Sequence, residues 1–183
     1  MNWKTLSSEY FINTKYFTAR KDVCETENGK IIPEYYVVEL GTTMCALGIT
    51  ENNEAVMIRQ YRHPVGKTML EIPGGFADEN EVAEKAIARE MLEETGYEFA
   101  KYELVGEVAA NPGVLNNYTK LYLATGGKKI ANPVLDHNEE IKVELIPLDE
   151  VIELLLKNKI EQSLHANCIF YCLLKMGKLK LAK

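Results

Sequence analysis

The chain has 183 residues, of which 46% are hydrophobic and 26% are charged, and these values are typical of a globular protein. This length suits one domain, or one domain with a small appendage, and can bury a sizeable core. The net charge of -6 argues against broad binding to a nucleic-acid backbone, which needs clustered Lys and Arg. It does not exclude anionic substrates, because a bound divalent cation can invert the local field.

No hydrophobic run approaches the roughly 18 residues that would suggest a membrane span. The first residues also lack the apolar run of a signal peptide. The 4 cysteines form no CxxC pair. We therefore expect a cytoplasmic protein with reduced thiols, whose partners include neither a membrane nor nucleic acid.

The N-terminal part of the sequence is expected to be rich in β structure. Asn28-Gly29 is a dipeptide typical of a tight hairpin turn between two strands. A boundary near Gly41 would separate a β arm at 1–41 from a mixed α/β body at 42–183. The strands predicted before the first helix lie at 16–27, 31–40, 43–50, 55–62 and 68–72.

The first helix is predicted at about 81–95. Asp78 and Glu81 fit a start that resembles a capping box, and Gly96 fits the position just after a helix end. The remaining elements are expected to be strands at 102–110, 120–125 and 139–148, and helices at 149–158 and 165–176.

The predicted helix at 81–95 changes character along its length. On a helical wheel at about 100° per residue, the apolar arc of its first turns continues as an acidic arc that contains Glu90, Glu93 and Glu94. Acids are disfavoured at the C-terminal end of a helix, where the dipole is negative. Two interpretations remain open: a solvated acidic helix end, or a site for a hard cation such as Mg²⁺ or Mn²⁺.

The surrounding residues favour the cation site. Gly74-Gly75 would let the backbone approach a ligand closely just before the helix, and its carbonyl groups could serve as further oxygen ligands. Arg89 lies four residues before Glu93, a spacing that could orient one of the acids.

Together these residues resemble the Nudix box, in which a glycine, a glutamate and the segment R-E-U-x-E-E-x-G-U follow one another at fixed spacing. Every fixed position is filled, and only Tyr97 departs, because it is larger than the usual aliphatic residue. The motif also follows a predicted strand and a glycine turn, as the fold of that family requires. The matching residues are Gly75, Glu81, Arg89, Glu90, Met91, Glu93, Glu94, Gly96 and Tyr97.

The resemblance implies an α/β/α sandwich with a mixed sheet, in which the box forms a loop–helix–loop. It implies hydrolysis of a nucleoside diphosphate linked to another moiety, with Mg²⁺ or Mn²⁺ as cofactor. Dimeric members of the family swap an N-terminal antiparallel β arm between subunits, so we expect a domain-swapped homodimer. An arm of two predicted strands could not bury a core alone, which supports the dimer.

The resemblance also assigns roles by position. Glu90 and Glu94 would be the main metal ligands, Glu93 would bind a further metal or its water, and the carbonyl of Gly74 would complete a coordination sphere. Arg89 would orient the acids. Cations that bridge the phosphates would neutralise charge and lower the pKa of a water, and a nearby carboxylate would take the proton of that water as it attacks phosphorus.

Beyond the box, the chain resembles the ADP-ribose pyrophosphatase branch and its relatives that act on nucleoside diphosphate sugars. The segments at 59–64 and 71–75 match that branch, and Pro112 lies where ADP-ribose hydrolases carry a marker proline. This resemblance covers most of 20–157. It implies that Arg62 contacts the diphosphate as an always-charged bidentate donor.

Other assignments leave two interpretations open. Arg59 could contact substrate or be an exposed charge at a strand end. Glu139 or Glu140 matches the acidic loop that supplies a general base in some relatives, with a solvated turn as the alternative; the distance to Ile141 favours Glu139. An aromatic residue of the arm, with Tyr16 and Tyr36 as candidates beside Trp3, Phe17 and Tyr35, could stack on the base or pack in a core or dimer interface.

The foremost expectation is hydrolysis of ADP-ribose to AMP and ribose 5-phosphate. Gly74, where many ADP-ribose enzymes have alanine, and Glu34, where some relatives have arginine, are compatible with broader substrates that include GDP-mannose. Dinucleoside polyphosphates, NADH, a capped RNA end or a non-catalytic nucleotide sensor are further alternatives. The negative charge weighs against RNA, and the complete set of box acids weighs against a sensor. Finally, His165, Cys168 and Cys172 fit a soft-metal face or, as we favour, a buried helix stripe.

Overall fold

The computed structural model describes residues 1–14, 17–137 and 139–179. The chain divides into two compact units. The first unit comprises Met1–Gly41 and Ala109–Tyr118, and the second comprises Thr42–Val108 and Thr119–Lys183.

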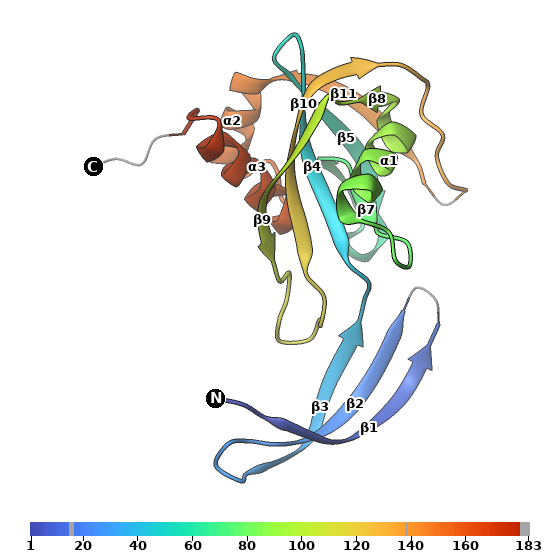
Figure 1. Cartoon of the computed structure of the whole chain (residues 1–183), viewed down its shortest axis with the longest axis vertical. Helices are drawn as coiled ribbons and strands as arrows, with labels where there is room; N and C mark the ends of the chain where they lie inside the picture. Colours follow the sequence, from blue (N-terminus) through green and yellow to red (C-terminus); the bar gives the residue numbers. More distant parts are fainter. Residues whose placement is uncertain (15–16, 138, 180–183) are drawn as a thin grey trace. The chain divides into compact units, whose positions relative to one another are not determined.

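The first unit contains a three-stranded antiparallel sheet in the order β1-β2-β3 (Figure 1). The predicted hairpin is present, because β2 and β3 pair antiparallel and Gly29 adopts a φ of 77° in their connection. The first strand was not predicted from the sequence, because every residue of β1 is exposed and no alternation marks a buried face. The strands are β1 (Lys4–Asn13), β2 (Thr18–Glu25) and β3 (Ile31–Glu39).

The loop at 109–118 belongs to this first unit, whereas the predicted boundary placed it in the α/β body. Its backbone is tied to β3, because the Val38 N–H donates to the carbonyl of Val114 (2.8 Å) and the Asn116 N–H donates to the carbonyl of Val38 (3.2 Å). A boundary drawn at one chain position could not anticipate this pairing between distant segments.

The second unit is built on a mixed sheet of eight strands. The order is β11-β5-β4-β10-β8, with β6 beside β5, β7 beside β4 and β9 beside β10. The central pair β4 and β10 is parallel, and the other pairs are antiparallel. The strands are β4 (Thr43–Thr50), β5 (Glu54–Arg62), β6 (Lys67–Glu71), β7 (Gly74–Phe76), β8 (Tyr97–Glu98), β9 (Lys101–Val108), β10 (Thr119–Lys129) and β11 (Ile141–Pro147).

Helices cover both faces of this sheet (Figure 1). Successive residues of β4 alternate between two cores, because side chains of a strand point to opposite faces. Met44 packs with the buried residues of α1, whereas Cys45 packs with those of α2 and α3. This arrangement confirms the predicted α/β/α sandwich with a mixed sheet. The helices are α1 (Ala83–Thr95), α2 (Leu148–Leu156) and α3 (Ser163–Lys175), and a short 3₁₀ turn, η1, spans His63–Val65.

The start of α1 differs from the prediction, and its end agrees. The helix begins at Ala83, and its N-cap residue Val82 makes no side-chain cap. Asp78 and Glu81 instead close a preceding turn, in which the Asp78 N–H donates to the Glu81 carboxylate at 3.0 Å. The predicted capping box is therefore wrong. Gly96 ends the helix with a φ of 76°, as predicted. Among the described residues, no helix is long and apolar enough to cross a membrane.

Gly96 provides a test of how tightly the end of α1 is packed. A β carbon there would lie 2.2 Å from the carbonyl oxygen of Ala131, in addition to the strain of the left-handed backbone. Gly66 has a φ of 63° but no atom within 4 Å of such a carbon. We expect Gly66→Ala to lower the free energy of unfolding by about 1 kcal/mol, and Gly96→Ala by about 3 kcal/mol. Urea denaturation measures both, and equal losses would contradict the packing argument.

Candidate active site

The last turns of α1 bring two glutamates against the glycine pair that precedes the helix. The Glu94 carboxylate accepts a hydrogen bond from the Gly74 N–H at 3.1 Å, and Glu94 is only 4% exposed. A β carbon on Gly75 would lie 2.5 Å from the carboxyl carbon of Glu90. A residue with a β carbon at position 75 would therefore push the Glu90 carboxylate away from the glycine turn. Because both carboxylates pack against this turn, the interpretation of a solvated acidic helix end does not hold for Glu90 and Glu94.

Gly74 is held just as closely on its other side. The residue pairs with Cys45 of β4 in the short strand β7. A β carbon on Gly74 would lie 2.3 Å from the carbonyl oxygen of Met44. The close approach of β7 to β4 therefore fixes the backbone groups of Gly74 beside the end of α1.

Arg89 donates hydrogen bonds to three acidic side chains of this region. Its Nη1 donates to Glu90 and to Glu93, each at 2.9 Å. Its Nε and Nη2 donate to Glu81 at 3.2 and 3.1 Å. The hydrogen bond to Glu81 is the main cause that raises the pKa of Arg89. This geometry fits the predicted role of Arg89 in orienting the acids, and that role stays a prediction.

The electrostatic environment of Glu90 and Glu94 favours the binding of a cation. Burial raises the pKa of Glu90 and raises the pKa of Glu94 to about 8. The negative charge of Glu139 raises both pKa values further. Two ionised carboxylates one helical turn apart in a partly buried site repel each other, and a bound cation removes that repulsion.

The donor set suits a hard divalent ion. Carboxylate oxygens from Glu90 and Glu94 and the carbonyl of Gly74 are the oxygen ligands that Mg²⁺ and Mn²⁺ prefer. In the described residues as they stand, no group of three His, Cys, Asp or Glu side chains is arranged to hold a metal ion. Arg89 engages one oxygen of Glu90, Oε1, so a cation would bind that carboxylate through Oε2.

A second charged pair lies beside the first. Arg62 at the end of β5 donates from Nε to Glu71 at 3.0 Å and also from Nη2, although Glu71 has no exposed surface. This hydrogen bonding raises the pKa of Arg62, and the charges of Glu94 and Glu139 raise it further. The structure therefore brings Arg62 within electrostatic range of the acidic site. Its Nε edge is taken by Glu71, which leaves the Nη1 side for an anionic ligand.

Glu71 was not predicted from the sequence as a residue of the site. The residue lies on β6 between the buried residues Leu70 and Ile72. A charged residue within an apolar strand is rare unless it has a partner of opposite charge. The position of Glu71 between two apolar residues was therefore a signal that it is paired with another side chain.

The two acids of the predicted base loop differ. Glu139 is half-buried and its carboxylate accepts the Asp136 N–H at 3.1 Å, whereas Glu140 is exposed. Glu139 is among the main causes that raise the pKa values of Glu90 and Glu94. Arg59 donates from Nε to Glu144 on the neighbouring strand β11 at 3.0 Å, which matches the interpretation of a surface charge; a substrate contact by Arg59 stays a prediction.

The remaining predicted substrate residues belong to the first unit or lie outside the described residues. Tyr36 on β3 is 54% exposed and its ring centroid lies 6.2 Å from that of Phe11. Pro112 lies in the loop at 109–118. Tyr16 lies outside the described residues. Their contacts with substrate stay predictions.

The helix stripe on α3 is buried, as we favoured. His165, Cys168 and Cys172 are all buried, and the Cys168 thiol lies 3.4 Å from the carbonyl oxygen of Tyr122. These cysteines are free thiols.

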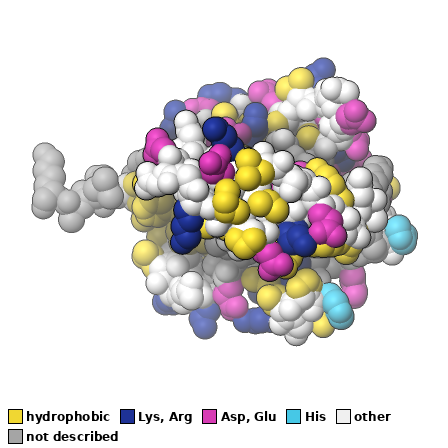
Figure 2. Space-filling model, turned by 90° about the horizontal axis from the view of Figure 1, so that it is seen from below, with side chains coloured by type: hydrophobic (Ala, Val, Ile, Leu, Met, Phe, Trp, Pro, Cys, Tyr) yellow, Lys and Arg dark blue, Asp and Glu magenta, His cyan; other side chains and the backbone are white. Residues whose placement is uncertain are grey.

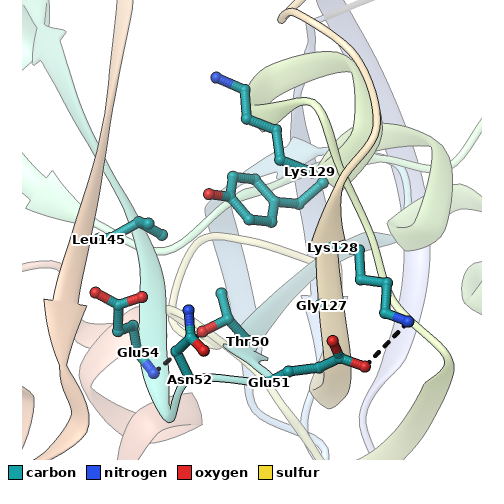
Figure 3. Close-up of a pocket in the computed structure, with 9 residues that line it drawn as sticks. Thr50, Glu51, Asn52, Glu54, Gly127, Lys128, Lys129 and Leu145 are labelled. Atoms are coloured by element: carbon teal, nitrogen blue, oxygen red, sulfur yellow. Dashed lines mark hydrogen bonds and ion pairs between the residues drawn. The ribbon is translucent and has the colours of Figure 1, made fainter.

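A pocket of about 270 Å³ opens elsewhere in the second unit (Figure 3). Its walls contain none of the predicted catalytic or metal-binding residues. Lys128 and Glu51 form an ion pair at 3.1 Å in this wall and largely neutralise each other. The candidate site therefore remains the group of residues at the glycine turn. The pocket is lined by Thr50, Glu51, Asn52, Glu54, Tyr97, Gly127, Lys128, Lys129 and Leu145.

The fold and the acidic site together define a class of protein. The structure is similar to the crystal structure of an ADP compounds hydrolase, with a TM-score of 0.84 over 98% of both chains at 18% identity. The model of the NUDIX domain matches residues 40–168, and the model of the nucleoside diphosphate sugar hydrolase N-terminal domain matches residues 3–38. The chain belongs to the Nudix family, as the resemblance implied.

Two curated relatives extend this comparison. The chain is 31% identical over 161 residues to the methanol dehydrogenase activator of Bacillus methanolicus, covering 87% of this chain and 86% of the relative. It is 27% identical over 173 residues to the ADP-ribose pyrophosphatase of Bacillus subtilis (strain 168), covering 94% and 93%. The prediction of a Nudix pyrophosphohydrolase is confirmed at the level of this enzyme class.

Proposed function

We propose that the protein hydrolyses the diphosphate bond of nucleoside diphosphate sugars with Mg²⁺, and that ADP-ribose, which yields AMP and ribose 5-phosphate, is its main substrate. The observation that carries this proposal is the pair Glu90 and Glu94, packed against Gly74-Gly75 with Arg62 in electrostatic range. The similarity to an ADP-ribose pyrophosphatase over nearly the whole chain supports the choice of substrate.

Each residue of the site then has a chemical task. Glu90, Glu94 and the Gly74 carbonyl would hold the cation, with Glu93 at a further metal or its water. When bound, the cation supplies charge neutralisation for the diphosphate and makes water a better nucleophile. Arg62 would donate its Nη1 hydrogens to a phosphate oxygen, because its Nε edge is engaged by Glu71.

The remaining residues orient the acids and move a proton. Arg89 holds the Glu90 and Glu93 carboxylates through Nη1. Glu139 would take a proton on a carboxylate oxygen from the attacking water, since its charge lies within range of both box acids.

A substrate panel tests the proposal. The purified protein is incubated with Mg²⁺ and separately with ADP-ribose, GDP-mannose, a dinucleoside polyphosphate, NADH and an 8-oxo nucleotide. Anion-exchange chromatography then follows the release of monophosphates. We expect AMP from ADP-ribose at the highest kcat/KM. If no sugar nucleotide releases a monophosphate, the proposed function is wrong.

A second candidate is favoured by one comparison. The relative at 31% identity is named a methanol dehydrogenase activator. This name favours a regulatory role toward a dehydrogenase. Because dehydrogenases transfer hydride with a nicotinamide dinucleotide, we pair this candidate with NADH, one of the alternative substrates considered from the sequence. The same panel separates the two candidates, because the second predicts that NADH is cleaved faster than ADP-ribose.

The base loop offers a matched pair of variants. We expect Glu139→Gln to lower kcat roughly a hundredfold, the usual scale for loss of a general base. Glu140→Gln, which removes a neighbouring exposed carboxylate, is expected to stay within about twofold of the wild type. Steady-state kinetics with ADP-ribose at saturating Mg²⁺ measures both. Equal effects of the two substitutions would contradict the assignment of Glu139.

We further propose that a second copy of the chain covers the arm, as a domain-swapped dimer would. The buried residues of the described arm strands are Asp22 and Cys24, both on β2, so its sheet has little core of its own. Figure 2 shows hydrophobic side chains beside charged ones on one face, and a cluster of exposed apolar side chains favours an interface. The exposed large hydrophobic residues of the arm are Met1, Trp3, Leu6, Tyr10, Phe11, Ile12, Phe17, Ile31 and Tyr36.

Light scattering coupled to gel filtration tests the dimer. We expect a mass of twice the 20.7 kDa of one chain. Phe11→Asp is expected to shift the population toward the monomer, and Ser7→Asp, which adds the same charge to the same strand, is expected to shift it much less. A monomeric wild type would rule the dimer out.

A further inference from the structure

His165 is a buried titratable residue that the proposed reaction does not use. It lies in the first turn of α3, and its side chain is 8% exposed. Its Nδ1 atom has no hydrogen-bond partner among the described residues. Buried polar atoms nearly always have a partner, so an exception of this kind requires a physical explanation.

The neighbour of this nitrogen is a carboxylate. Nδ1 of His165 lies 3.6 Å from Oε2 of Glu71, slightly beyond a normal hydrogen bond. Glu71 has no exposed surface, and its existing hydrogen bonds come from Arg62, whose side chain is 40% exposed. Glu71 therefore lies between a solvent-facing donor on β5 and a buried ring on α3.

The chemistry of the two groups determines where the imidazole proton lies. Burial lowers the pKa of His165 to about 4, so the ring is neutral near pH 7. A neutral ring has one N–H, and an ionised carboxylate only accepts. A lone pair on Nδ1 facing Glu71 would be repulsive, whereas an Nδ1–H would be attractive. The other charged or titratable neighbours of the ring are Arg62 and Cys168.

We propose that His165 is a positioning residue that offers the Glu71 carboxylate a second donor when the Arg62 guanidinium is drawn toward a bound diphosphate. Without this second donor, the buried charge of Glu71 would keep only a weakened hydrogen bond to Arg62. The free-energy cost of that loss would reduce the affinity for the anion. A movement of a few tenths of an ångström by Glu71 closes the distance to Nδ1. The identity of the anion rests on the proposed function, but the arrangement of the three side chains does not.

Two substitutions separate donation from packing. Asparagine at residue 165 places an amide N–H close to the position of Nδ1, whereas leucine fills similar space without a donor. Binding of α,β-methylene ADP-ribose with Mg²⁺ is measured by calorimetry. We expect His165→Leu to weaken binding about tenfold, the scale of a lost hydrogen bond to a charged group. We expect His165→Asn to stay within about threefold of the wild type. If the asparagine variant is as weak as the leucine variant, or if neither is weaker, the proposal is overturned.

A second measurement does not depend on the substrate. The ¹⁵N spectrum of the imidazole ring in the free protein distinguishes a protonated Nδ1 from one that carries a lone pair. We expect a protonated Nδ1, and a lone pair at this atom would overturn the proposal. If the wild type neither hydrolyses nor binds sugar nucleotides, the proposed function fails separately. The ring tautomer, together with binding of inorganic diphosphate by the same variants, then decides the role of His165.

Discussion

Replacing Glu94 by glutamine is expected to lower kcat for ADP-ribose by roughly a hundredfold to a thousandfold, while making the metal-free protein more stable at pH 8 and above. The loss of activity follows because the neutral amide is a poor ligand for a hard cation. Glu84→Gln, at an exposed acid of the same helix, should leave kcat nearly unchanged.

The gain in stability follows from the pKa of Glu94. Burial raises this pKa from the ordinary value of 4.5 to about 8 in the folded protein. Below about pH 4.5 the carboxyl is protonated in both the folded and the unfolded states, so the charge costs nothing. Between about pH 4.5 and pH 8, the Glu94 carboxyl ionises in the unfolded state but stays protonated in the folded state. The stability of the wild type therefore falls as the pH rises, until the pH exceeds the folded pKa.

Thermal unfolding of both proteins in EDTA at pH 5 and pH 9 checks this prediction. The difference in Tm should favour the glutamine variant at pH 9 and shrink at pH 5. Adding Mg²⁺ should reverse the order, because an ion that binds the folded wild type stabilises it in proportion to its concentration over Kd. A glutamine variant that is less stable in EDTA at pH 9 would show that the Glu94 carboxylate has compensating partners.

Arg62→Ala is expected to lower the free energy of unfolding by about 2 to 4 kcal/mol, because it leaves the Glu71 charge buried without its partner. Arg59→Ala is the matched control. It removes another arginine from β5 with a similar exposure, 43% against 40%, but its partner Glu144 keeps 22% of its side-chain surface. Solvent can replace a partner of that kind, so we expect a loss below about 1 kcal/mol.

Urea denaturation of the two variants measures this difference. The double variant Arg62→Ala with Glu71→Gln should recover much of the lost stability, since it also removes the buried charge. Similar losses for Arg62→Ala and Arg59→Ala, or no recovery in the double variant, would show that the Glu71 charge is not the cause. KM for ADP-ribose is expected to rise for Arg62→Ala, because Arg62 is the residue proposed to bind the diphosphate.

The elements with a buried face could be predicted from the sequence. Strand β4 was predicted at 43–50 and lies at Thr43–Thr50, and the end of α1 at Gly96 follows from a glycine with a left-handed backbone. Strand β1 was missed because all of its side chains are exposed, so no hydrophobic alternation marks it. The capping box failed because the Asp78–Glu81 pair closes a turn before the helix rather than its first turn.

The residues of the site that lie on one helix could be predicted from their spacing. The residues that tertiary packing brings together could not be predicted. Glu90 and Glu94 lie one turn apart and face the glycine pair, as their spacing indicates. Glu71 and His165 are separated by most of the second unit in sequence, and only the packing of α3 on the sheet brings their side chains together. No local pattern could reveal that neighbourhood.

The close contact between β7 and β4 at Gly74 also restricts how this protein can diverge. Any residue other than glycine at position 74 would add a β carbon to this contact. In this chain the methyl group of an alanine would occupy space already filled by the Met44 carbonyl. An exchange at that position therefore has to be accompanied by a shift of the neighbouring strand. Lineages that differ at this turn are expected to differ in β4 as well, and the two segments should change in concert.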